Sequence, residues 1–236
     1  MSKSGQPVDW TRLGVEAVVI VVSILLAFAI DAWWDQQREV RDAKDQVARV
    51  VSELRANVAL LQAQDQSLEY TTRAAREFLA VMGPDVGPVS IQDFGSNTFR
   101  IYGVSTLSLS NSATQNFLSS GQLTAGRWID VRLALAELLS EAQQAENSSL
   151  ELRQKRPAML EHMQAVVSGL DVVKEHPLMA DYPASRFISD ASALLSDMKF
   201  ESLIAYYAIR MEINRQNVHA LLERYGAVID MIENGH

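Results

Sequence analysis

Leu13–Trp34, LGVEAVVIVVSILLAFAIDAWW, is a long apolar run near the N-terminus, and the expected architecture follows from it. No charged residue occurs between Ala17 and Ile30. A helix needs about 20 mostly apolar residues to cross the hydrocarbon of a bilayer, and tryptophan favours both interfaces. Trp10 precedes the run and Trp34 ends it. The run therefore predicts a transmembrane helix over residues 13–34.

A cleaved signal peptide is the alternative interpretation of this run. Ala27-Phe28-Ala29 matches the small-x-small pattern that signal peptidase recognises. However, the residues before the run carry only Lys3 and Arg12 as basic side chains, and Glu16 stands at its edge. We therefore expect an uncleaved anchor, which follows a short N-terminal tail over residues 1–12.

The charges that flank the run give conflicting indications of its orientation. Lysine and arginine are more numerous after the run than before it, which favours a cytoplasmic body. The nearest charges, Arg12 before it and Asp31 and Asp35 after it, favour the opposite orientation, and long domains translocate largely regardless of charge. We expect a single-pass protein of the bacterial inner membrane whose body is periplasmic or otherwise extracytoplasmic.

Glu16 and Asp31 are ionisable residues at the two edges of the run. Such residues are costly inside a membrane and often functional there. Near an interface, however, a charged side chain can reach the headgroups. We expect this solvated state for both residues, with a functional carboxylate as the alternative.

Composition excludes several classes of function. The chain carries a net charge of −8 and has an isoelectric point near 5.0, so it offers no basic surface to nucleic acid. It contains no cysteine, which excludes disulfides, thiolate metal sites and cysteine nucleophiles. Its 236 residues leave enough chain after the run for one sizeable domain.

Apolar residues at alternating steps of three and four indicate three long helices. The first continues from the run to Met82 without a glycine or proline after Val15. The second begins near Trp128 and contains Pro157, which removes a backbone hydrogen bond and is expected to kink or split the helix. The third runs over about Met198–Glu233.

The segments between the long helices carry turn and capping signals. Gly83–Pro88 ends the first helix, and Ser90 is placed to cap a short helical piece. Residues 95–116, rich in Ser, Thr and Asn, predict a solvated, loop-like connection that leads into a helix over Ser112–Ser119, ended by Gly121. Two more elements are expected: a loop over Gly169–Pro183 and a short helix over Ser185–Ser196.

These elements predict an all-α fold. The transmembrane helix continues into an antiparallel helical bundle of three long helices plus short helices, over residues 35–236. Each apolar stripe has to be buried against another, which a bundle achieves. A parallel coiled coil of the first helix with a second copy is the alternative packing, and the polar seam residues Asp65 and Asn214 set the register in either arrangement.

Two groups of residues resemble a known family. Glu16, the apolar run and Asp31-Ala32-Trp33-Trp34-Asp35 stand in this order before a charged helix, and Ser119-Ser120-Gly121-Gln122-Leu123 precedes a helix with Arg132-Leu133. In these features the chain resembles an uncharacterised bacterial family of single-pass membrane proteins with a helical body. The resemblance covers the anchor, the first helix and the middle segment. It implies this architecture and no activity, because the family has none assigned.

No pattern in the sequence predicts a catalytic, cofactor-binding or metal site. A nucleophile elbow, a phosphate-binding glycine loop and a dinucleotide fingerprint are all missing. No two histidines have the spacing of helical metal ligands, and His162 and His219 meet only if the bundle brings their helices together. Tyr206, Tyr207 and Tyr225 lie on or near the last seam and are expected in the core. The prediction is a protein that is not an enzyme and needs no cofactor.

The function that fits best is a membrane-anchored helical bundle that acts as a structural or interaction protein, either a scaffold or an accessory subunit. Its expected partners are the lipid bilayer and either itself or another membrane or envelope protein, with no nucleic acid. One alternative is an extracytoplasmic sensory or ligand-binding module that signals through a membrane partner. Another is an enzyme or a proton-handling accessory subunit that uses Glu16 in the membrane.

Overall fold

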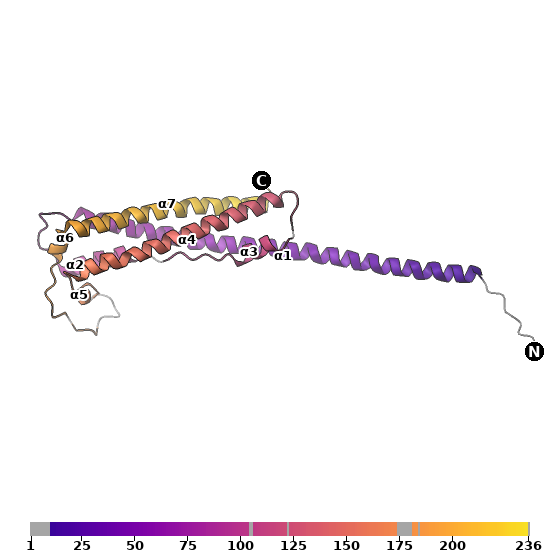
Figure 1. Ribbon diagram of the computed structural model, residues 1–236, viewed down its shortest axis with the longest axis horizontal. Coiled ribbons are helices and arrows are strands. Elements are labelled where there is room, and N and C mark those ends of the chain that lie inside the picture. The colour runs from indigo at the N-terminus through magenta and orange to yellow at the C-terminus, as the bar shows by residue number, and fades with distance from the viewer. Residues whose placement is uncertain (1–9, 104–105, 122, 174–180, 184, 236) are drawn as a thin grey trace, which may run out of the picture. The chain divides into compact units, whose positions relative to one another are not determined.

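The computed structural model describes residues 10–103, 106–121, 123–173, 181–183 and 185–235, with side chains at all of these except 10–21, 91–92, 96–97, 99, 102 and 173. Within these ranges the chain is helical and contains no strand. The helices are α1 (Trp10–Ala80), α2 (Ile91–Tyr102), α3 (Ser112–Ser119), α4 (Trp128–Gln164), α5 (Gly169–Val173), α6 (Ala191–Leu195) and α7 (Met198–Asn234) (Figure 1). The chain divides into two compact units, Met1–Arg49 and Val50–His236.

The first unit corrects the prediction of a membrane anchor. Across the described part of the chain, no helix combines the length and the apolar character that crossing a bilayer requires. The transmembrane helix over residues 13–34 and the single-pass inner-membrane localisation are therefore wrong.

Two of the residues that the sequence singled out belong to this unit. Asp31 is exposed on α1. The side chain of Glu16 lies outside the described residues, as does most of the tail expected over residues 1–12.

The second unit is a bundle of α4, α7 and the part of α1 that follows Arg49. Ion pairs fix the helix directions: Glu137 and Glu151 of α4 meet Arg224 and Arg210 of α7, so α4 and α7 are antiparallel. Likewise, Arg55 and Arg76 of α1 meet Glu233 and Glu212 of α7. The prediction of an all-α antiparallel bundle is confirmed for this unit. Its buried core includes Leu54, Leu61, Leu68, Ala75, Val131, Leu135, Leu138, Ala142, Phe200, Ile204, Met211, Val218 and Leu221.

Several helix ends follow the capping signals in the sequence. Ser90 caps α2, because its side chain accepts a hydrogen bond from the backbone N–H of Asp93 at 3.1 Å. Helix α3 has the predicted bounds, and Gly121 after it has a φ of +67°, a conformation that suits glycine. Asp197 caps α7 by accepting from the N–H groups of Lys199 and Phe200.

Other elements differ from the prediction. Helix α4 runs through Pro157 without splitting, and Pro157 stands at an exposed position where one lost hydrogen bond is tolerated. The helix α5 replaces the start of the loop expected over Gly169–Pro183, much of which lies outside the described residues. Helix α6 is shorter than expected because Asp190 caps it, accepting a hydrogen bond from the N–H of Ala193. Figure 1 shows α2, α5 and α6 gathered near one end of α4 and α7.

Candidate functional site

A buried carboxylate holds the start of α3 against α1. Glu53 accepts hydrogen bonds from the backbone N–H groups of Ala113 and Thr114 at 2.8 and 2.9 Å and from the hydroxyl of Thr114 at 2.8 Å. The hydroxyls of Ser110 and Ser112 donate to it at 3.1 and 3.3 Å. A negative charge near a helix N-terminus is favourable, because unpaired N–H groups point outward there.

These bonds set the ionisation of Glu53. Burial alone would raise the pKa of its carboxyl, but the hydrogen bonds from Ala113 and Thr114, together with the hydroxyl of Ser110, lower it below its usual value. Glu53 is therefore ionised at neutral pH and fully occupied by its donors.

Three further side chains hold the segment that leads into α3. Asn57, which is fully buried, donates to the carbonyl of Ser110 at 2.7 Å and accepts from its N–H at 3.0 Å. The N–H groups of Leu107 and Leu109 donate to Ser149 and Glu146 of α4. The loop-like connection expected to be solvated is thus fastened to two long helices. We refer to Glu53, Asn57, Glu146 and Ser149 as the polar clamp.

Tyr225 of α7 joins the polar clamp from the third helix. Asn57 donates to its hydroxyl at 3.3 Å. Burial, reinforced by the negative charges of Glu53 and Glu146, raises the pKa of Tyr225 to about 12, although the bond from Asn57 acts in the opposite direction. All these groups bond to one another or to backbone, so the polar clamp is a device of the fold and leaves no reactive group open.

An exposed apolar stripe runs along the face of α7 opposite the core. Tyr206, Ile209 and Ile213 are 50, 60 and 39% exposed. Their spacing of three and four places them on one face of the helix. Tyr207 and Tyr225 are buried as predicted, whereas the prediction that Tyr206 belongs to the core is wrong.

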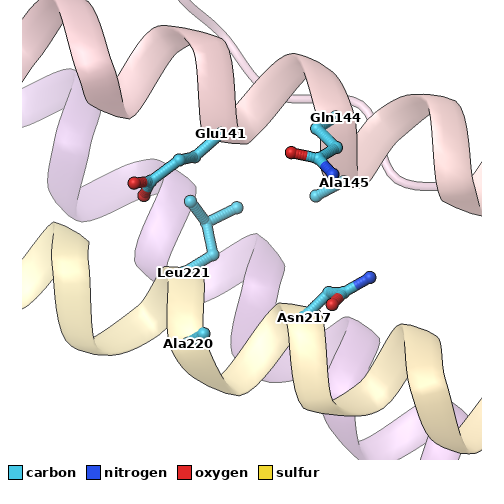
Figure 2. A pocket seen from close by; sticks show the side chains of 6 residues that line it. All are labelled: Glu141, Gln144, Ala145, Asn217, Ala220 and Leu221. Atoms are coloured by element: carbon cyan, nitrogen blue, oxygen red, sulfur yellow. The ribbon is translucent and has the colours of Figure 1, made fainter.

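Beside this stripe, α4 and α7 enclose a notch of about 160 Å³. Its lining consists of Glu141, Gln144 and Ala145 from α4 and Asn217, Ala220 and Leu221 from α7. Figure 2 shows the side chain of Leu221 pointing into the space between the two helices, with Glu141 at one end and the carboxamides of Gln144 and Asn217 at the other. Small side chains at Ala145 and Ala220 leave this space unfilled.

The notch interrupts a row of ion pairs along the α4–α7 seam. On one side of it Arg224 pairs with Glu137 at 2.8 Å and with Glu141 at 3.4 Å. On the other side Arg210 pairs with Glu151 at 2.9 Å. Between them the seam carries Gln144 and Asn217, whose carboxamides have no hydrogen-bond partner among the residues described. The notch therefore offers free polar groups above an apolar floor.

The two described histidines, His162 and His219, do not come together in a site. His162 bonds to Asp197 at 2.9 Å and His219 to Asp65 at 2.9 Å, on different parts of the bundle. His176 and His236 lie outside the described residues. Across the described ranges no group of histidine and carboxylate side chains is arranged to hold a metal ion. Asp65, which the sequence placed in a seam, also pairs with Arg215 at 3.1 Å.

The first unit has an exposed apolar surface of its own on α1. Trp33 and Trp34 contact each other edge to face, with ring centroids 5.2 Å apart. The exposed apolar side chains of this surface are Val22, Ile24, Leu25, Leu26, Phe28, Ile30, Trp33 and Trp34. Contiguous exposed apolar surface usually marks an interaction site.

Comparison with known proteins identifies no relative. No family model matches the chain, and neither curated proteins nor solved structures contain a match. The resemblance to the uncharacterised bacterial family therefore stays a prediction, and the function has to be argued from the geometry of the bundle.

Proposed function

We propose that the protein is a non-catalytic interaction protein and that its bundle presents a docking face to another protein. The observation that carries this proposal is the exposed stripe of Tyr206, Ile209 and Ile213 on α7. A helix in a three-helix bundle needs one apolar face, and α7 has a second one on the opposite side. An exposed apolar face of this kind is typical of a surface that a partner covers.

The stripe indicates the form of the partner. Apolar residues at spacings of three and four pack against a helix that carries the same pattern. The partner is therefore an amphipathic helix of another protein, which lies along α7 with its apolar side on the stripe.

The charge of the chain indicates the sign of the charge on the partner. A net charge of −8 attracts a basic helix and repels a second copy of the same chain. Because one helix buries a modest area, the complex is expected to be transient.

The test uses a designed helical peptide with leucine on one face and lysine on the other, added to the purified full chain. Its affinity is measured by fluorescence anisotropy for the wild type, Ile209→Glu and Ile129→Glu. Ile209 on the stripe and Ile129 on α4 are 60 and 57% exposed, so the two substitutions are matched in chemistry and exposure. We expect Ile209→Glu to weaken binding by about tenfold or more, since a charge at the centre of an apolar contact removes a main anchor.

Ile129→Glu should change the affinity by less than about twofold, as expected for a residue outside the contact. Equal effects of the two substitutions, or self-association that Ile209→Glu abolishes without any binding of the peptide, would show that the proposed partner is wrong.

A further inference from the structure

The lining of the notch between α4 and α7 suits a ligand that carries a positive charge at the end of an aliphatic chain. The only charge that its lining contributes is the carboxylate of Glu141. The carboxamides of Gln144 and Asn217 add two more oxygens at the other end (Figure 2). The acceptors therefore lie at both ends of the notch, and Glu141 is the one that gives an ammonium group a charged partner.

The floor of the notch complements the stem of such a group. Ala145 and Leu221 are buried, and Ala220 is exposed at the rim. Methylene groups gain free energy when they cover apolar surface of this kind, as the stems of lysine side chains do on proteins. An anionic group, in contrast, would meet Glu141 without a cation in the lining.

Arg224 already pairs with Glu137 and Glu141, but it does not neutralise the charge of the notch. Its Nη2 bonds to Glu137 at 2.8 Å, and its Nε lies 3.4 Å from Oε2 of Glu141 without hydrogen-bond geometry. The three side chains together carry a net charge of −1. Glu141 therefore keeps the capacity to accept from a second cation.

We propose that the notch binds an alkylammonium group, the lysine side chain of the helix that docks on α7. This inference rests on the proposed function for the source of the lysine. The notch continues the line of the stripe: Asn217 and Ala220 follow Ile213 at steps of four and three. A helix that covers Ile209 and Ile213 can thus place one lysine over the notch.

The test uses n-butylammonium chloride as the probe, with 1-butanol as a probe of the same stem without the charge. The methyl signals of Ala145, Ala220 and Leu221 in the full chain are followed by NMR during each titration. We expect saturable shifts of these signals with butylammonium and none with butanol. Glu141→Gln should weaken binding by about tenfold, because it replaces a charge-assisted hydrogen bond with a neutral one.

A matched pair of variants checks that the notch itself is the site. Ala220→Met fills the notch from its exposed rim, whereas Ala227→Met adds the same side chain at another exposed position of α7. We expect Ala220→Met to abolish the shifts of Ala145 and Leu221 and Ala227→Met to leave them unchanged. Equal shifts with butanol, or undiminished binding in Ala220→Met, would overturn the proposal.

The same variants separate this inference from the docking proposal. If Ile209→Glu lowers the affinity for the peptide but butylammonium does not bind to the wild type, the notch proposal fails and the docking face stands. If butylammonium binds but Ala220→Met leaves the peptide affinity unchanged, the partner's lysine is excluded as the occupant. Loss of peptide affinity in Ala220→Met, and not in Ala227→Met, supports the lysine as the source.

Discussion

The carboxylate of Glu53 accepts a hydrogen bond from the backbone N–H of Thr114 at 2.9 Å, although the two residues are 61 positions apart in the chain. This contact joins α1 to the start of α3, and through Asn57 and Tyr225 the same cluster reaches α7. The polar clamp thus determines where the segment before α3 lies on the bundle.

Replacing Glu53 by Gln should destabilise the bundle. The amide keeps the shape of the side chain but loses the charge, and its NH2 group faces donors. We expect the free energy of unfolding to fall by about 2 kcal/mol, as is typical when a buried hydrogen-bonded charge is removed. Urea denaturation measures it, and Glu223→Gln at an exposed position of α7 is the control. An equal effect of the two substitutions would show that the polar clamp contributes no stability.

The stabilisation by Glu53 should vanish in acid. The pKa of Glu53 in the folded state is lower than its ordinary value of 4.5. The stability that the ionised carboxylate contributes is therefore fully present at a pH above the ordinary value, and it is lost as the pH falls through the pKa of the folded state. The difference in free energy of unfolding between wild type and Glu53→Gln should therefore be constant from about pH 7 to about pH 5.5 and shrink below about pH 4. A difference that stays constant in acid would contradict this assignment.

Tyr225 should titrate at high pH. Its pKa of about 12 exceeds the unfolded value near 10, so folding favours the neutral phenol. The stability that this provides is fully present below the unfolded pKa and is lost as the pH rises through the folded one. Ultraviolet absorbance of tyrosinate, taken as wild type minus Tyr225→Phe, should show a midpoint near 12. A midpoint near the unfolded value would mean that the ring is accessible to water.

Thr72 and Thr98 provide a matched pair of buried threonines. The hydroxyl of Thr98 donates to the carbonyl of Phe94 at 2.7 Å, whereas that of Thr72 has no partner among the described residues. Thr98→Val should therefore cost about 1 kcal/mol of unfolding free energy, and Thr72→Val should cost nothing or stabilise by up to about 1 kcal/mol. Thermal or urea denaturation measures both. A larger loss in Thr72→Val than in Thr98→Val would indicate a partner for Thr72.

The long helices of the bundle were predictable because burial repeats at the helical period. Leu135 and Leu138 of α4 and Ile204 and Met211 of α7 are apolar at steps that only a helix places on one face. The caps at Ser90 and Gly121 were also readable, since capping depends on residues close in sequence.

The polar clamp and the notch were not predictable, because both depend on contacts distant in sequence. Glu53 precedes the seam residue Leu54 on a helix rich in charges, and nothing local separates it from an exposed glutamate. Ala145 and Ala220 are ordinary helix formers until the register of α4 against α7 brings them together. The membrane prediction rested on the composition of the apolar run, whereas no described helix is long and apolar enough to cross a bilayer.

Isoleucine methyl NMR of the full chain with the leucine–lysine peptide tests the docking face most directly. Ile209 and Ile213 report on the stripe, Ile129 on the exposed end of α4, and Ile24 and Ile30 on the apolar surface of the first unit. Docking on α7 predicts that the signals of Ile209 and Ile213 shift and saturate with the peptide while that of Ile129 does not move. Shifts confined to Ile24 and Ile30 would contradict it and place the interaction site on the first unit.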